Sequence, residues 1–245
     1  MAGRLMKRVL GILRLIAFAV VAGIGTLMLF GLGLISRDHR KVFFLYSGIT
    51  RTIRGVLNIR VRLHGEVPRQ QGVLMSNHRS YIDIVLIPSK VPYVIVAKKQ
   101  VKAWPIIGQA AVAIRTIFVD RDSAESRRKT RESIKQRLES GLSVLIYPEG
   151  TTFEGPGILA FKPGIFRHCA DAGFSVIPVA IEFEDKAMAW IGADTFLPHF
   201  IEAFSRWSVR VHVSIGPEMK GSDGEELRRQ AQQWVDVETR RLAAL

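Results

Sequence analysis

The stretch Gly72-Val73-Leu74-Met75-Ser76-Asn77-His78-Arg79-Ser80-Tyr81-Ile82-Asp83 joins an apolar run to a short helical pattern. Residues 72–75 predict a buried strand, and residues 84–87 predict the apolar side of a short helix that ends at Pro88. His78 then follows a strand end, and Asp83 lies about one turn into the helix. From there a carboxylate can fix one imidazole nitrogen and leave the other free as a base. A capped helix with a hydrogen-bonded histidine explains the same residues equally well.

The chain from residue 59 onward alternates strand-like and helix-like runs. The strand-like runs are 59–63, 73–76, 93–97, 116–119, 143–147, 175–181 and 209–215. The helix-like runs are 81–87, 123–139, 163–172 and 224–244. Strands separated by helices indicate βαβ units. The sequence therefore predicts an α/β fold with a mainly parallel sheet and helices on both faces.

The net charge of +13 is concentrated near the N-terminus. Residues 1–62 hold eleven Lys and Arg side chains against the single acid Asp38, whereas residues 63–245 hold 24 basic and 21 acidic side chains. Because the excess surrounds the most apolar part of the chain, it favours contact with anionic lipid over nucleic acid. The only cysteine, Cys169, excludes an internal disulfide and a multi-cysteine metal site.

Residues 15–35 carry no charged side chain. As a helix they span roughly 32 Å, which is enough to cross the hydrocarbon layer or to anchor in one leaflet. The following Ser36–Lys41 segment is not a small-residue cleavage site, so we expect an anchor and not a signal peptide. Residues 42–58 predict an amphipathic helix, which we place at the membrane interface in preference to packing on the domain. The domain boundary is expected near residue 62, with a membrane-anchoring segment before it and a catalytic domain at 63–245.

Polar side chains follow three of the predicted strands. His78, Arg121 and Glu149 each come directly after an apolar run, and Lys162 is a further candidate for anion contact. In an open α/β sheet, strand ends of one polarity line the ligand crevice, so we expect these groups to meet. Arg121 also has a simpler role in pairing with a neighbouring Asp. Pro178 within the run 175–181 indicates an edge strand or a wall that faces substrate.

The sequence lacks several common catalytic motifs. It has no G-x-x-x-x-G-K-[ST] loop, no H-E-x-x-H and no G-x-S-x-G. A His–Asp pair without an enzyme nucleophile suits direct transfer, in which His78 takes a proton from a substrate hydroxyl that attacks a bound thioester. Asp83 orients His78 and stabilises the imidazolium that forms.

Four blocks in order over residues 73–180 are similar to the glycerolipid acyltransferases, typified by 1-acylglycerol-3-phosphate acyltransferase. Residues 77–83 resemble their H-x4-D block, 118–121 the second block, 147–151 the third (usually Phe-Pro-Glu-Gly-Thr-Arg) and 176–179 the fourth. The resemblance implies His78 as base, Asp83 as its partner, and head-group binding by Arg121, Glu149, Gly150 and Thr151. It also implies acyl-CoA or acyl-carrier protein as co-substrate, no metal or other cofactor, and an active site on the cytoplasmic face of the inner membrane.

One departure concerns the acceptor. Thr152 replaces the family's arginine, which weakens recognition of a phosphate monoester unless Arg121, Lys162 or Lys98 compensates. Threonine here also resembles the lyso-ornithine-lipid acyltransferases, whose acceptor is zwitterionic. We rank acyl transfer to 1-acylglycerol-3-phosphate, giving phosphatidic acid, before the ornithine lipid. A lipid hydrolase and a non-catalytic lipid-binding protein at the membrane surface remain as alternatives from other classes.

Overall fold

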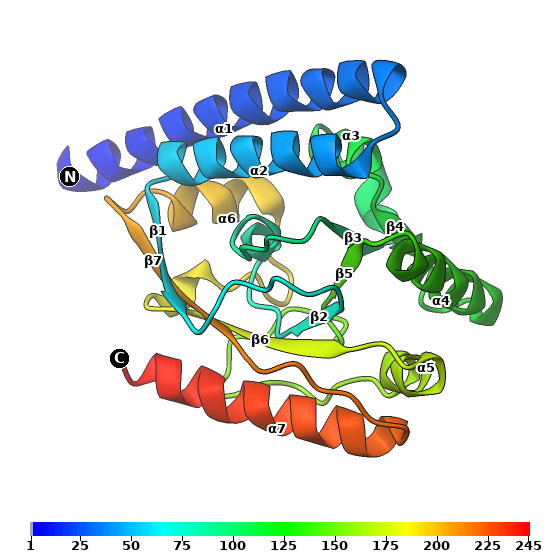
Figure 1. The fold of residues 1–245 in the computed structure, drawn as a ribbon. Helices are drawn as coiled ribbons and strands as arrows, with labels where there is room; N and C mark the ends of the chain where they lie inside the picture. Colours follow the sequence, from blue (N-terminus) through cyan, green and yellow to red (C-terminus); the bar gives the residue numbers. More distant parts are fainter. Residues whose placement is uncertain (1) are drawn as a thin grey trace.

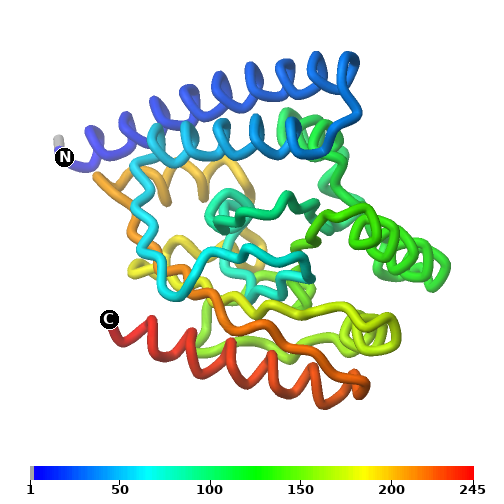
Figure 2. The backbone as a smooth tube through the Cα atoms, in the orientation of Figure 1, coloured from blue at the N-terminus to red at the C-terminus, as the bar shows by residue number. Residues whose placement is uncertain are grey.

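The computed structural model describes residues 2–245 (Figures 1 and 2). The strands are β1 (Ile59–His64), β2 (Val73–Ser76), β3 (Tyr93–Lys98), β4 (Ile117–Val119), β5 (Ser143–Ile146), β6 (Val176–Phe183) and β7 (Val209–Ile215). The α-helices are α1 (Ala2–Ile35), α2 (His39–Val56), α3 (Ile107–Ala113), α4 (Ala124–Glu139), α5 (Gly164–Ala172), α6 (Phe196–Ala203) and α7 (Gly224–Ala243). Short 3-10 helices are η1 (Tyr81–Val85), η2 (Lys99–Ala103) and η3 (Lys186–Met188).

The seven strands form one sheet in the order β1-β7-β6-β2-β5-β3-β4. The five strands from β6 to β4 run parallel, whereas β7 pairs with β6 antiparallel and β1 pairs parallel to β7. Each predicted strand forms with its ends within two residues of the predicted ones. The expected α/β class with a mainly parallel sheet is therefore confirmed. Helices α3 and α6 were not predicted.

Helices cover both faces of the sheet (Figure 1). On one face, α2 and α6 form a core with the inner side chains of the strands. This core includes Leu57 at the end of α2, Phe200 within α6 and Phe204 at the end of α6. On the other face, α4, α5 and α7 bury Phe166 and Leu227 against the opposite side chains. Strands covered on both faces read as continuous apolar runs, and all eight residues of β6 are buried.

The prediction that Pro178 marks an edge strand is wrong, because β6 lies between β7 and β2. Pro178 stands just past the β6–β7 ladder, which begins at Val179, and its carbonyl accepts the N–H of Gly216. The N–H and C=O of one strand residue point to the same neighbouring strand, so the nitrogen of Pro178 faces β7 and not β2. Proline has no N–H to donate, and at this position, one residue outside the β6–β7 ladder, the missing N–H interrupts no ladder hydrogen bond. The pairing of Pro178 with Met75 of β2 is therefore undisturbed.

Helix α1 begins at Ala2, well before the predicted start at residue 15, and is long and apolar enough to cross a membrane. It lies along α2, α3 and α6 and does not project away from the domain (Figure 1). Arg14 is buried in this contact and donates to the carbonyls of Phe204 and Trp207 at 3.1 and 2.8 Å, beyond the end of α6. The opposite face of α1 leaves large apolar side chains exposed: Leu5, Met6, Val9, Ile12, Leu13, Ile16, Val20, Ile24, Leu27, Met28, Phe30, Leu34 and Ile35.

Helix α2 forms as predicted, but its apolar face is turned inward. Val42, Tyr46 and Ile53, which we assigned to the membrane interface, are buried within the protein. The spacing alone could not distinguish these two environments, because a membrane and a protein core select the same apolar stripe. Strand β1 runs to His64, so it crosses the boundary expected near residue 62 and ties this region into the sheet.

Candidate active site

His78 and Asp83 meet at the end of β2, where the chain turns into η1. His78 Nδ1 lies 2.8 Å from Asp83 Oδ2, and the same oxygen accepts the backbone N–H groups of Arg79 and Ser80 at 2.7 and 2.9 Å. Asp83 is fully buried, whereas the His78 side chain is 21% exposed. A carboxylate held this way accepts the Nδ1 proton, so Nε2 is left without one and can accept a proton from a ligand.

Glu149 is hydrogen-bonded to the backbone of the loop that carries His78 and does not line the cavity described below. Its Oε1 accepts the backbone N–H of His78 at 3.0 Å, and its Oε2 accepts that of Leu159 at 3.4 Å. The side chain is buried, which raises its pKa from 4.5 to about 7 despite these two hydrogen bonds. Glu149 therefore supports the backbone of the loop that carries His78, and the head-group contact implied by the resemblance stays a prediction.

Two basic side chains converge on Gly150, which lies within the third block. Arg121 Nη1 donates to the Gly150 carbonyl. Gly150 has a φ of +81°, and a Cβ atom there would lie 2.7 Å from Lys162 Nζ and 3.5 Å from Arg121 Nη1. The left-handed backbone at this position favours glycine, and the absence of a side chain lets both cations approach. The tight turn thus brings the two cations to one place.

A cavity of about 530 Å³ opens beside His78 and extends between α1, α2, α3 and the sheet. Its polar end is lined by His78, Lys98, Arg121, Gly150, Thr151 and Thr152. The remainder is mostly apolar and includes Phe18, Ala22, Gly25, Leu29, Ile49, Ile53, Val85, Ile95, Val101, Ile107 and Ile114. Of the predicted site residues, Asp83, Glu149 and Lys162 do not line it. The arrangement suits a ligand with a polar head and a long apolar chain.

Thr152 closes the polar end of the cavity toward Trp190. Its Oγ1 donates to the Trp190 carbonyl, and the Trp190 ring packs edge-on against Trp104, with 5.3 Å between the ring centroids. All three residues line the cavity. The threonine side chain is therefore engaged with the rim and does not offer a positive charge to a ligand.

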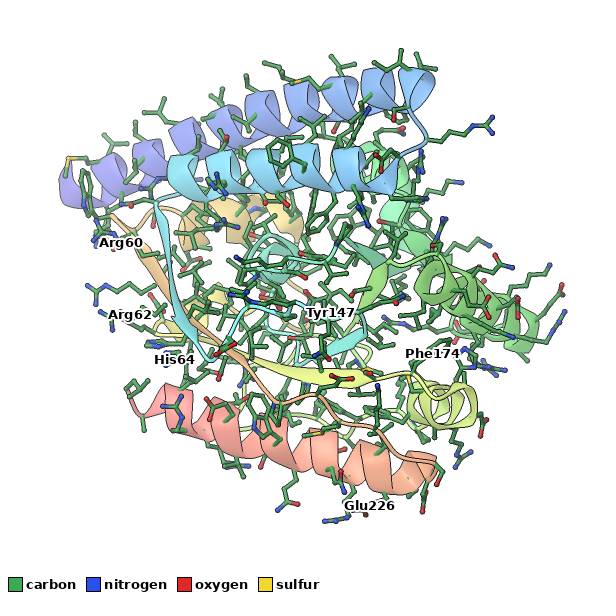
Figure 3. All side chains as sticks on the ribbon, viewed as in Figure 1. Arg60, Arg62, His64, Tyr147, Phe174 and Glu226 are labelled. Atoms are coloured by element: carbon green, nitrogen blue, oxygen red, sulfur yellow. The ribbon has the colours of Figure 1, made fainter. Side chains whose placement is uncertain are left out.

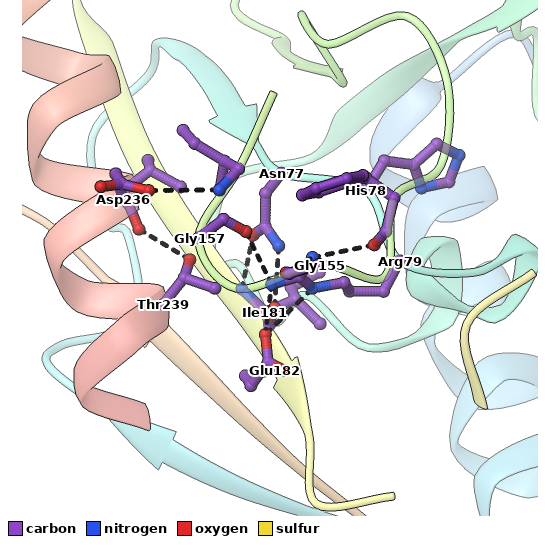
Figure 4. Close-up of polar contacts among 12 residues, drawn as sticks. Asn77, His78, Arg79, Gly155, Gly157, Ile181, Glu182, Asp236 and Thr239 are labelled. Carbon is purple, nitrogen blue, oxygen red and sulfur yellow. Dashed lines mark hydrogen bonds and ion pairs between the residues drawn. The ribbon is translucent and has the colours of Figure 1, made fainter. Parts of the chain in front are cut away.

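Arg79 is a structural centre that the sequence analysis missed (Figure 4). Its buried guanidinium pairs with Glu182 of β6 through Nε at 2.9 Å and Nη2 at 2.6 Å. It also donates to the carbonyls of Phe153 at 2.8 Å, Gly155 at 3.2 Å and Gly157 at 2.9 Å. One side chain thereby holds the loop that follows the third block against the loop of the first. A buried acid in an otherwise apolar strand, Glu182, was the signal available in the sequence.

Tyr147 is a second residue that the sequence analysis left without a role. It lies in the interior of the molecule (Figure 3), directly after β5. Its ring stacks on the imidazole of His78, with centroids 4.1 Å apart and planes tilted by 20°. The ring also lines the cavity, so it fixes the plane of the imidazole from within the site.

Comparison with known proteins decides the family. The sequence model of the family described as "Acyltransferase" matches residues 58–182, which include His78, Asp83 and Glu149 but not Trp190 or the cavity-lining residues of α1 and α2. The chain belongs to this acyltransferase family. A lyso-ornithine lipid O-acyltransferase of Pseudomonas aeruginosa is 35% identical over 186 residues, covering 73% of this chain and 72% of the relative. A 1-acyl-sn-glycerol-3-phosphate acyltransferase of Neisseria meningitidis is 30% identical over 138 residues, or 56% and 54% of the two chains.

The fold of this acyltransferase is also found in a solved structure. The crystal structure of a 1-acyl-sn-glycerophosphate acyltransferase from Thermotoga maritima superposes with a TM-score of 0.73 and covers 98% of each chain. The two sequences are 19% identical, so the likeness concerns the fold alone. It includes the N-terminal helices, because nearly the whole acyltransferase chain is matched.

Proposed function

We propose that this acyltransferase moves a fatty acyl group from a thioester to the hydroxyl of a lysolipid at a membrane surface. The observation that carries the proposal is the 2.8 Å contact between His78 Nδ1 and Asp83 Oδ2 at the mouth of an apolar cavity. His78 acts as general base through Nε2, and Asp83 is its orienting partner. The donor is acyl-CoA or acyl-carrier protein as co-substrate, with no other cofactor.

The proposed reaction needs no enzyme nucleophile. His78 Nε2 takes the proton of the acceptor hydroxyl, whose oxygen forms a bond to the thioester carbonyl carbon. The carbonyl electrons move to its oxygen, and the oxyanion then collapses and expels the thiolate. The imidazolium returns its proton to the thiolate, which leaves as a thiol. Asp83 stabilises the imidazolium while it exists.

The cavity supports a lipid substrate. Its apolar part passes between α1 and α2 and the catalytic domain, and the outer face of α1 exposes a continuous row of apolar side chains. An acyl chain would thus reach His78 without crossing water. We place the protein at the inner membrane with its active site on the cytoplasmic face, where the basic residues of 1–62 meet anionic lipid.

For the acceptor we now favour lyso-ornithine lipid over lysophosphatidate, reversing the order given by the sequence. Thr152 adds no cation to the polar end and is bound to the rim at Trp190. A zwitterion with one carboxylate requires fewer cations than a phosphate monoester. The Pseudomonas relative, which covers the larger share of the chain, is named for this acceptor.

Lysophosphatidate, which would give phosphatidic acid, is the second candidate. Arg121 and Lys98 line the polar end, and Lys162 lies beside Gly150. Two cations at the glycine turn and a third on the cavity wall favour a doubly charged phosphate. The Neisseria relative is named for this acceptor.

The test is an acyl-transfer assay with the purified full chain in phospholipid vesicles. Labelled acyl-CoA and acyl-carrier protein are each supplied with lyso-ornithine lipid, with lysophosphatidate or without acceptor. We expect acceptor-dependent transfer, faster to lyso-ornithine lipid, and its loss in His78→Ala but not in the control His64→Ala. Thioester loss without acceptor would indicate a hydrolase, and vesicle binding without either reaction would indicate a lipid-binding protein.

A further inference from the structure

The short helix η1, which carries Asp83, has few hydrogen bonds of its own. The Asp83 N–H donates to the Ser80 carbonyl at 3.1 Å, and the Leu86 N–H donates to the Asp83 carbonyl at 3.0 Å. Hydrogen-bond geometry in a 3-10 helix is poorer than in an α-helix, and the last carbonyls of any helix lack a partner within it. The C-terminal end of η1 therefore needs donors from other elements.

Helix α2 supplies two such donors. The Tyr46 hydroxyl donates to the Ile84 carbonyl at 2.6 Å, and Arg54 Nη1 donates to the Val85 carbonyl. These two carbonyls belong to the residues that follow Asp83 directly, and they are the last two of η1. Side chains that donate to the final carbonyls of a helix stabilise its end. One face of α2 thus fixes the peptide planes on the C-terminal side of Asp83.

Arg54 is an unusual residue for its surroundings. It is one of the basic side chains near the N-terminus, yet it is half-buried and points into the domain, where it reaches the Val85 carbonyl. Burial lowers its pKa, and the groups whose charges act on it are Tyr93, Arg51 and Tyr46, none of which is a carboxylate. A guanidinium taken out of water without an acid partner costs free energy. A departure from this rule indicates a function for the hydrogen bond that Arg54 makes.

The contact between Asp83 and His78 is sensitive to small movements of η1. Asp83 Oδ2 lies 2.8 Å from His78 Nδ1 and fixes the tautomer in which Nε2 is the base. If η1 moved, this oxygen would separate from the imidazole, and the ring proton of His78 could reside on either nitrogen. A displacement of about 1 Å, caused by a mutation far from the chemistry, can lower an enzyme's rate roughly a hundredfold. Donors at the end of η1 can therefore control the base through the backbone.

We propose that Arg54 and Tyr46 are positioning residues for the catalytic pair, and that α2 determines the position of Asp83 through its hydrogen bonds to the end of η1. This rests on the proposed function. Both side chains act through the backbone of residues 84 and 85 and exchange no proton with a substrate. Helix α2 also lines the cavity and packs along α1, whose outer face is apolar. The N-terminal helices thus complete the active site as well as anchoring it.

A purely structural role is the competing explanation. Loss of either hydrogen bond would then lower the melting temperature but leave His78 unchanged in the folded molecules. Arg14 provides the comparison, because it is also a buried guanidinium that donates to backbone carbonyls at a helix end. Its acceptors are the carbonyls of Phe204 and Trp207, which lie beyond α6 and outside η1.

The test compares Arg54→Met with wild type, using the full chain in phospholipid vesicles for transfer from acyl-CoA to the better acceptor. We expect kcat to fall roughly ten- to a hundredfold with an unchanged KM for acyl-CoA. Arg54→Lys, which restores a charged donor, should recover most of the lost kcat. Arg14→Met is the matched control and should lower the melting temperature without lowering kcat.

Nitrogen NMR of the same proteins, labelled at histidine, reports the tautomer of His78 directly. At a pH where histidine is neutral, wild type, Arg54→Lys and Arg14→Met should each show His78 protonated at Nδ1. Arg54→Met should show a mixture of the two tautomers. A change in stability alone would not alter this signal in the folded protein.

The proposal would be overturned if Arg54→Met kept the wild-type kcat or a single His78 tautomer, or if Arg14→Met lost as much activity. If Arg54→Met does not fold, Tyr46→Phe decides by the same two measurements, because it removes only a hydroxyl and keeps the ring. The underlying function is judged separately. Absence of transfer by wild type rejects the proposed function, whereas the His78 tautomer in the variants still shows whether α2 positions Asp83.

Discussion

The Oε1 atom of Glu149 lies 3.0 Å from the backbone nitrogen of His78 and accepts its N–H. The carboxylate is buried, and desolvation raises its pKa from 4.5 to about 7. The folded protein therefore holds the Glu149 proton more tightly than the unfolded chain does. This contribution to the free energy of unfolding is complete below pH 4.5 and is lost as the pH rises through 7.

We predict that Glu149→Gln removes this pH dependence. Relative to the variant, wild type should lose up to roughly 3 kcal/mol of stability between the two pKa values. Melting temperatures of both proteins, measured across that range, test the sign. A difference that stays constant with pH would show that Glu149 ionises in the folded protein as it does in the unfolded chain.

Asp83→Asn tests the orientation of His78. Asparagine keeps the size of the side chain but cannot accept the Nδ1 proton as a charged carboxylate does, so the other tautomer of His78 becomes accessible. We expect kcat to fall by roughly 10³-fold with little change in the KM for either substrate. A variant that retains most of its kcat would indicate that the Nδ1–Oδ2 contact has a structural role only.

Thr152→Arg tests the choice of acceptor. An added guanidinium at the polar end should raise kcat/KM for lysophosphatidate relative to lyso-ornithine lipid by about tenfold, the effect of one charge-assisted hydrogen bond. Thr152→Val is the matched control, since it removes only the hydrogen bond to the Trp190 carbonyl. If both variants change the ratio of kcat/KM values for the two acceptors equally, selectivity depends on the Thr152–Trp190 hydrogen bond and not on the charge at position 152.

Gly25→Leu tests the path of the acyl chain. Gly25 lines the apolar part of the cavity, and a Cβ atom there would lie 2.9 Å from side-chain atoms of Ile49. The larger residue should shift donor preference toward shorter acyl chains in a competition between thioesters of different length. Gly23→Leu is the control, because a Cβ at that position meets no atom within 4 Å. An unchanged preference in Gly25→Leu would place the acyl chain elsewhere.

The strands and the meeting of His78 with Asp83 were predictable from local pattern. Apolar runs of strand length, each followed by a polar residue, locate the sheet and the carboxyl ends of its parallel strands. His78 and Asp83 are five residues apart in sequence, which brings their side chains together across the turn into the helix. The cations near Gly150 followed from the same reasoning. These features depend on residues close in sequence or on a rule that all parallel strands share.

Other features depend on contacts between distant segments, which the sequence pattern does not specify. The inward face of α2 is decided by its packing on the domain, since an apolar stripe is identical for a core and a membrane. Glu149 ends a strand as His78 and Arg121 do, but the direction of its side chain is set by the backbone of another loop. The contact of Arg79 with Glu182 joins residues 103 positions apart.

The most direct test of the account is single-turnover acyl transfer by His78→Ala, with melting temperature and far-ultraviolet circular dichroism measured on the same sample. We predict that the variant folds as wild type does, binds acyl-CoA, and transfers at least about a thousandfold more slowly. A folded variant that retains most of the wild-type rate would contradict the assignment of His78 as the base.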